Sequence, residues 1–194
     1  MKMRLGYLVD LNTTTGILIP RITGGLYSHV IVIFLLDDGS EVYFESIWKK
    51  DETTQKTGVR GPLPISKIEE WMAEHPKDRQ FDRQPKTGWL PLSDEEVERA
   101  YSMVMNAVNE IEYAKLQILQ NWVERRLGVY IHIGNGSNKK WTCCEVPLRI
   151  LPSRVWTYFS LLNYTADDFA PSGHNGPSIM DGVSAWIMKE GTIV

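Results

Sequence analysis

The feature that most constrains the fold is the apolar run from Ser28 to Leu36. Every residue after His29 in this run is apolar and most are β-branched, which is typical of a central strand covered on both faces. The turn sequence Asp37-Asp38-Gly39 follows, and residues 41–45 have the composition of a return strand. The sequence therefore predicts a β-hairpin within the sheet of an α+β protein.

His29 heads this strand and is a candidate general base. A titratable ring on an otherwise apolar strand needs a polar partner, because burying it without one costs free energy. A three-residue turn with Gly39 at positive φ puts Glu45 on the same face as His29, diagonally across at about 7–8 Å. A two-residue turn instead moves Glu45 to the other face, and Ser46 takes its place. We expect Glu45 to orient the imidazole, on condition that the turn has three residues.

The stretch from Trp141 to Val146 holds both cysteines of the chain, side by side. Thr142 followed three residues later by Glu145 is a capping box, which predicts a helix with Thr142 as its N-cap. Cys143 and Cys144 are then the first two helical residues, where free N–H groups and the helix dipole favour a thiolate. This is the setting that a nucleophilic cysteine requires, although most free cysteines are small apolar core residues.

The other histidines are weaker partners for a cysteine. His75 and His174 lie in segments expected to be exposed loops, and His132 lies in a short expected strand and is a reserve base. The adjacent cysteines with His132 and His29 lack the Cys-x-x-Cys spacing of metal sites, so we expect neither a metal nor a cofactor.

The rest of the chain shows alternating strand, helix and loop patterns. We expect a strand at Leu5–Leu11, a second extended piece at Gly16–Ile22, and polar loops at 51–64 and 77–91. Helical spacing predicts helices at Pro64–Glu74, from the Ser93 capping box to Leu127 with a break near Asn109–Glu112, and at Ser153–Leu162. A short strand is expected at Val129–Ile133.

Composition limits the classes of protein that the chain can belong to. Its 194 residues predict a single domain, 1–194, with an unassigned insertion at about 51–91 and an irregular tail from about 163. A net charge of −3 without a long basic run argues against nucleic-acid binding.

No apolar run approaches the length of a membrane span, and the N-terminal residues lack a signal-peptide pattern. Adjacent cysteines rarely form a disulfide, so a reduced, cytoplasmic setting is expected.

Together these motifs resemble the circularly permuted NlpC-type papain-like family, which includes the YiiX-like proteins and, more distantly, the lecithin retinol acyltransferase group. The resemblance rests on Tyr-Ser-His-Val ending at Val30, Phe-Glu-Ser ending at Ser46, and Cys-Cys-Glu ending at Glu145. It implies a permuted papain-like fold, an antiparallel sheet packed against helices, with the histidine strand preceding the cysteine helix.

The resemblance also implies the roles of the site residues. Cys143 would be the nucleophile, because Cys144 stands where the family has serine, and Cys144 is the alternative. His29 would be the base and then the acid, with Glu45 orienting it. The backbone N–H of the cysteine would hold the oxyanion, with Tyr113 as a candidate side-chain donor.

The activity expected from this resemblance is hydrolysis of an amide bond through a thioester intermediate. The usual substrates of the family are cell-wall peptides. Two alternatives are an acyl-lipid hydrolase or acyltransferase with the same triad, and an inactive binding module that keeps the fold. An acyl-lipid enzyme normally has a membrane-facing patch, and the sequence contains no amphipathic basic helix to supply one.

Overall fold

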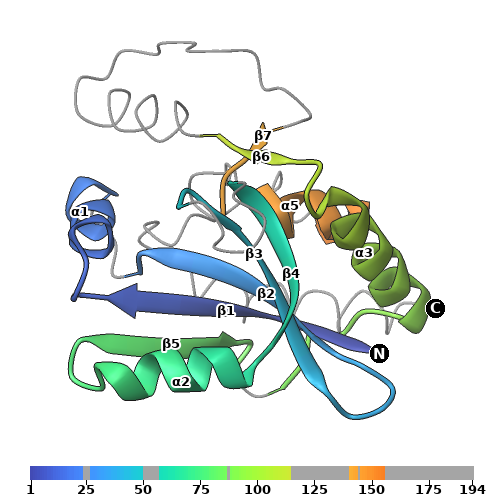
Figure 1. Ribbon diagram of the computed structural model, residues 1–194. Coiled ribbons are helices and arrows are strands. Elements are labelled where there is room, and N and C mark those ends of the chain that lie inside the picture. Colours follow the sequence, from blue (N-terminus) through green and yellow to red (C-terminus); the bar gives the residue numbers. More distant parts are fainter. Residues whose placement is uncertain (24–26, 50–56, 87, 115–139, 144, 156–194) are drawn as a thin grey trace.

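A five-stranded antiparallel sheet is the centre of the molecule, in the order β4-β3-β2-β1-β5 (Figure 1). The computed structural model describes residues 1–23, 27–49, 57–86, 88–114, 140–143 and 145–155. The strands of the sheet are β1 (Lys2–Asp10), β2 (His29–Leu35), β3 (Glu41–Ile47), β4 (Gly58–Pro64) and β5 (Arg79–Gln84). The helices are α1 (Thr14–Thr23), α2 (Ser66–Glu74), α3 (Asp94–Ala107) and α5 (Glu145–Ile150). The strands β6 (Glu112–Tyr113) and β7 (Lys140–Trp141) form a separate parallel pair.

The β2–β3 hairpin has the predicted three-residue turn. Leu36 N–H donates to the Ser40 carbonyl at 2.9 Å, and Gly39 has a φ of +84°. Val32 pairs with Phe44 in the same register. The register on which the position of Glu45 depends is thereby confirmed.

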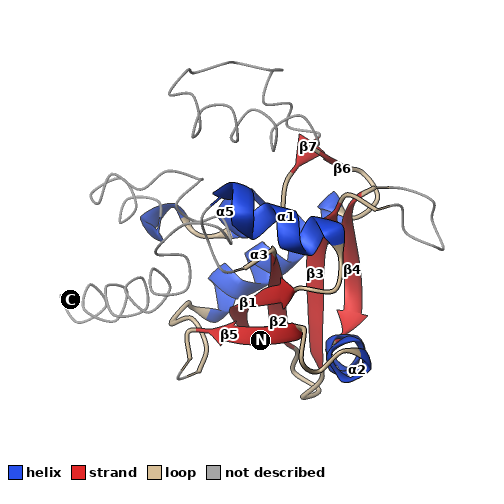
Figure 2. Ribbon diagram, turned by 90° about the vertical axis from the view of Figure 1, so that its left-hand side faces the viewer, coloured by secondary structure: helices blue, strands red, loops and turns tan. Residues whose placement is uncertain are grey.

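Helices cover both faces of the sheet, and each face has its own core. On one face α2 packs through Ile68 against residues of β1, β2 and β3. On the other face α3 and α5 pack against the alternate residues of the same strands. Figure 2 shows α3 and α5 on this second side, with α2 on the opposite side of the strands. This is a mixed α+β architecture in which an antiparallel sheet packs against helices, as predicted at that level.

Several of the predicted elements are confirmed. β1, β2, β3 and α2 lie where the patterns place them. The capping box at the start of α3 is present, since Ser93 Oγ accepts from Glu96 N–H and the Glu96 carboxylate accepts from Ser93 N–H. α3 ends at Ala107, close to the predicted break, and Asn109 follows with a φ of +64°.

Four predictions about local structure are wrong. Residues 14–23 form the helix α1 and not an extended piece, Tyr113 lies in β6 and not in a helix, and the two expected loops contain β4 and β5. β4 and β5 are the edges of the sheet, where glycine, proline and charged residues are tolerated because one side of the strand has no partner. The segment expected to be an insertion therefore supplies both edge strands.

Other predictions lie outside the described residues. These concern the helix beyond residue 114, the strand at 129–133, the helix at 153–162 beyond Val155, the tail from residue 163, and the residues Cys144, His132 and His174.

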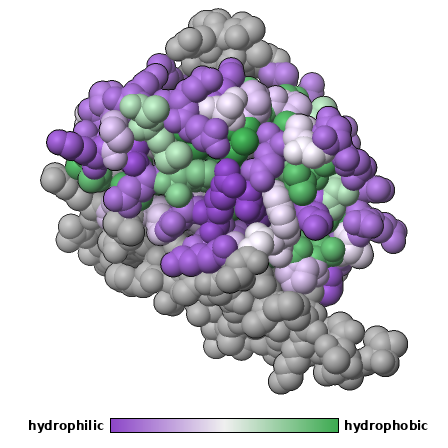
Figure 3. Space-filling view, turned by 90° about the horizontal axis from the view of Figure 1, so that it is seen from below, coloured by the Kyte–Doolittle hydropathy of each residue, from purple (hydrophilic) through white to green (hydrophobic). Residues whose placement is uncertain are grey.

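The described helices and one face of the molecule were compared with what a membrane-spanning protein requires. Among the described helices, none has the length and apolar character needed to cross a bilayer. Polar residues predominate on the face seen from below, with small apolar groups between them (Figure 3).

Candidate active site

Three side chains from distant parts of the sequence meet at one end of the β2–β3 hairpin. His29 begins β2, Glu45 lies near the end of β3, and Cys143 precedes α5. His29 Nε2 lies 2.6 Å from Glu45 Oε2, and the His29 ring also forms a side-chain hydrogen bond with Cys143. The structure thus brings together the three residues that the sequence singled out.

The pleat of β3 explains how its neighbouring residues serve two sides of the sheet. Side chains alternate between faces along a strand, so Glu45 points toward His29 while Ser46 points into the core on the α3 and α5 side. Ser46 is fully buried, and its Oγ donates to the carbonyl oxygen of Trp141 at 2.9 Å. The alternative that Ser46 orients His29 is therefore wrong.

The segment around Cys143 is held by Glu145. The Glu145 carboxylate accepts from Thr142 N–H at 2.7 Å and from the Thr142 hydroxyl at 3.2 Å. The helix α5 begins at Glu145, so Cys143 lies in the turn before the helix and not at its first position as predicted. Cys143 is 8% exposed and belongs to the core on the α3 and α5 side.

Arg60 is a fourth member of the cluster that the sequence analysis missed. Its Nε and Nη2 lie 2.9 Å and 2.7 Å from Glu45 Oε1, so each oxygen of this carboxylate has its own partner. Burial raises the pKa of Glu45, but the hydrogen bond and charge of His29, together with the charge of Arg60, bring it below the usual value. Glu45 is therefore ionised at neutral pH. Arg60 lies in a Gly/Pro-rich segment read as loop, and no pattern in that segment points to a partner for Glu45.

His29 carries a proton over a wide pH range in this setting. Burial lowers the pKa of His29, but its hydrogen bonds to Cys143 and Glu45 raise it more, to about 10. Because Nε2 is paired with Glu45, Nδ1 is the ring nitrogen that remains for Cys143. An imidazolium beside a thiol favours the thiolate, which is the nucleophilic form of cysteine.

A groove of about 930 Å³ opens over His29, Glu45 and Arg60. Aromatic and apolar side chains line much of it, and two exposed cations also lie along it. These lining residues are Tyr43, Leu63, Trp71, Lys49 and Lys67. Cys143 is not among the lining residues and meets the groove through its contact with His29.

Trp48 and Tyr113 form an aromatic pair at this groove. Their rings stack with centroids 6.3 Å apart at 27°, and Trp48 is 48% exposed while Tyr113 is buried. Both residues line the groove. Tyr113, the candidate oxyanion donor, is therefore close to the site, and Trp48 offers an exposed ring to a bound molecule.

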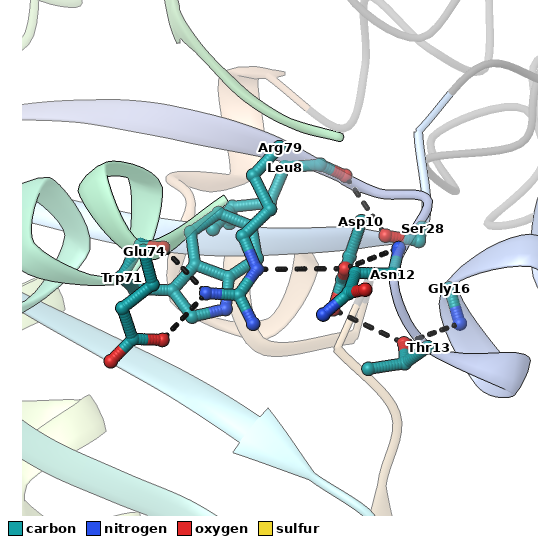
Figure 4. Close-up of polar contacts among 9 residues, drawn as sticks. All are labelled: Leu8, Asp10, Asn12, Thr13, Gly16, Ser28, Trp71, Glu74 and Arg79. Atoms are coloured by element: carbon teal, nitrogen blue, oxygen red, sulfur yellow. Dashed lines mark hydrogen bonds and ion pairs between the residues drawn. The ribbon is translucent and has the colours of Figure 1, made fainter. Parts of the chain in front are cut away.

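The groove wall at α1 is fixed by Asp10. Its carboxylate accepts from Asn12 N–H at 3.0 Å and from the Thr13 hydroxyl at 3.1 Å (Figure 4). Thr13 Oγ1 in turn accepts from Gly16 N–H at 3.1 Å, which caps the start of α1. Asp10, Thr13 and Gly16 all line the groove, so this wall is held by local hydrogen bonds.

Arg79 joins the same wall to α2. Its Nη1 donates to the Trp71 carbonyl oxygen at 2.5 Å and to the Glu74 carboxylate at 2.8 Å, and its Nε lies 3.6 Å from Asp10 (Figure 4). The Arg79 guanidinium also stacks on the Trp71 ring. The two sides of the groove are thus connected through one cation.

The other candidate residues do not join this cluster within the described structure. His75 is the C-cap of α2 and does not line the groove. Among the described residues, no group of three or more histidine, cysteine, aspartate or glutamate side chains could hold a metal ion.

No family model matches the chain, and no curated protein matches it either. The geometry of the cluster therefore carries the functional argument.

Proposed function

We propose that the protein is a cysteine hydrolase of amide bonds with a permuted papain-like fold. Cys143 is the nucleophile, His29 the general base and acid, and Glu45 the residue that orients the imidazole. The observation that carries the proposal is the position of His29, which is hydrogen-bonded to a buried thiol on one side and to a buried carboxylate on the other.

The charge state of the cluster supports the first chemical step. With His29 protonated and Glu45 ionised, the Cys143 thiolate attacks the carbonyl carbon of the amide and forms a C–S bond. The carbonyl oxygen becomes an oxyanion, for which the Cys143 backbone N–H and Tyr113 are the donors we propose. His29 gives its proton to the leaving nitrogen as the C–N bond breaks, and the amine departs from a thioester.

The second step restores the enzyme. Neutral His29 takes a proton from water, whose oxygen attacks the thioester carbon. The C–S bond breaks, the acid product leaves, and Cys143 returns as a thiolate beside the imidazolium. Glu45 remains ionised throughout and holds the ring in one orientation.

The groove supports a peptide as the substrate class. Its volume of about 930 Å³ is at the upper end of the range of ligand sites, about 300–1,000 Å³. It combines aromatic walls with the polar groups of the site. Cell-wall-derived peptides are the first substrates to screen, with carboxylic esters as the comparison.

The test is the pH dependence of iodoacetamide alkylation, with fragment mapping that separates Cys143 from Cys144. We expect Cys143 to have an apparent pKa well below the ordinary value of about 8.5, and His29→Ala to slow its labelling. His75→Ala is the matched control and should label like the parent. An ordinary thiol pKa that is indifferent to His29 would overturn the proposal.

A further inference from the structure

Arg60 is placed to control the charge and orientation of Glu45. Glu45 Oε2 pairs with His29 at 2.6 Å, whereas Oε1 accepts from Arg60 Nε at 2.9 Å and Nη2 at 2.7 Å. The Glu45 side chain is only 7% exposed, while that of Arg60 is 34% exposed. We propose that Arg60 is a positioning residue that keeps Glu45 ionised and holds Oε2 against His29. The inference rests on the proposed function, because it concerns the same site.

An irregularity in β4 brings Arg60 to this place. Tyr43 pairs with Leu63, and continuing that register would put Gly61 opposite Glu45. The register shifts between Tyr43 and Glu45, so Arg60 is the residue opposite Glu45. An extra residue in one strand re-aims the side chains beyond it, and such irregularities are frequent beside active sites. Because of this shift, the residue opposite Glu45 is the cation Arg60 and not Gly61, which has no side chain.

The reaction explains why a second cation is needed. Glu45 is compensated by both His29 and Arg60 while the imidazole is protonated. When His29 gives its proton to the leaving group, only Arg60 still carries a positive charge. A guanidinium keeps its proton at any ordinary pH, so Glu45 stays ionised and oriented through the whole cycle. A buried carboxylate facing a neutral imidazole alone would tend to take up a proton.

The test compares Arg60→Met with the parent in the alkylation of Cys143 across pH. Without Arg60 the pKa of Glu45 rises, so the anion that supports the imidazolium is lost earlier as the pH falls. An opposite charge at this distance changes a carboxylate pKa by about 1–3 units. We expect the acid limb of the Cys143 profile to move up by about one pH unit, which is about tenfold slower labelling on that limb. Arg60→Lys keeps a cation and should retain most of the parent profile.

Arg154 provides a matched control. It is 36% exposed, and its Nε and Nη2 contact the two oxygens of Glu96 at 2.7 Å and 2.5 Å. Arg154→Met therefore removes an arginine–carboxylate pair in which the arginine is about as exposed as Arg60, although Glu96 is more exposed than Glu45. Neither residue lines the groove, and we expect this variant to leave the acid limb unchanged. Arg60→Gln is a second variant for the case that Arg60→Met does not fold, and it should give the same shift.

A double-mutant cycle tests whether Arg60 acts through Glu45. In a Glu45→Gln background, Arg60→Met should cause no further shift, because the carboxylate through which it acts is already absent. The inference is overturned if Arg60→Met labels like the parent, or if its shift persists in the Glu45→Gln background. An ordinary thiol pKa in the parent would instead overturn the proposed function, so the two failures are distinguishable.

Discussion

Ser46 donates a hydrogen bond at 2.9 Å to the carbonyl oxygen of Trp141, which lies 95 positions later in the chain. The next residue back, Glu45, holds His29 on the other face of the same strand. One short stretch of β3 therefore fixes both the base and the segment that ends in Cys143.

Ser46→Ala should weaken the attachment of the Cys143 segment. The Trp141 carbonyl keeps its hydrogen bond from Ala114 N–H, so the expected loss of stability is about 1 kcal/mol, the net value of one hydrogen bond. Urea unfolding measures this loss, and alkylation of Cys143 should also slow. Ser40→Ala is the control, because Ser40 is an exposed turn residue that bonds to Asp38. Equal effects of the two variants would contradict the tethering role of Ser46.

The His29 ring should remain doubly protonated at pH 8. Its pKa is raised to about 10, chiefly because hydrogen bonds to Cys143 and Glu45 outweigh the effect of burial. Nitrogen-15 NMR of the ring should show two N–H groups at pH 8 in the parent and a lower ring pKa in Glu45→Gln. Because the folded pKa lies above the unfolded value of about 6.5, protonated His29 stabilises the fold, and this stabilisation is fully present below about pH 6.5. It is lost as the pH rises from 6.5 toward 10.

A neutral His29 ring at pH 8 in the parent would refute the raised pKa.

Gly58→Ala should be far more destabilising than Gly39→Ala. Both glycines have positive φ, which costs an L-residue about 1–2 kcal/mol. A Cβ on Gly39 would meet nothing within 4 Å, whereas a Cβ on Gly58 would lie 1.9 Å from the Ile111 carbonyl oxygen. This overlap with backbone should add about 1–3 kcal/mol. Chemical denaturation of the two variants measures the difference, and similar midpoints would be the contrary result.

Trp48→Ala should affect substrate binding without affecting the thiol. The exposed indole stacks on Tyr113 and lines the groove. With a peptide that the parent hydrolyses, we expect KM to rise about three- to tenfold, the equivalent of one aromatic contact. Alkylation of Cys143 should be unchanged. Met105→Ala removes a similarly exposed side chain from α3 and should alter neither quantity, and a lower kcat at constant KM for Trp48→Ala would contradict the binding role.

The sequence predicted the pairing of His29 with Glu45 on condition that the turn has three residues. The run from His29 to Leu35 indicates a central strand, and Asp37-Asp38-Gly39 indicates a turn of two or three residues, between which the structure decides. Because side chains alternate along a strand, the register alone decides which face Glu45 occupies. The same reasoning could not fix the start of the cysteine helix, because helix ends are defined only to within one or two residues.

The edges of the sheet were not predictable in the same way. β4 contains two glycines and two prolines, and β5 is the polar sequence Arg-Gln-Phe-Asp-Arg-Gln. Edge strands tolerate these residues because they pair on one side only, so local pattern does not distinguish them from loops. Arg60 was missed for this reason. Arg60 lies opposite Glu45 because of a register shift in β4, and no recognisable pattern in the local sequence predicts this shift.

The burial of Cys143 has a consequence for the meaning of thiol reactivity in this protein. An ordinary core cysteine reacts faster when the fold opens, because exposure is all that it lacks. Cys143 owes its proposed thiolate to His29, and His29 is brought to it by strands from the other end of the chain. Opening would expose the sulfur and remove its activating base together, so low concentrations of denaturant should slow the labelling of Cys143. The rate at which Cys143 is labelled would then measure whether the sheet that carries His29 is folded.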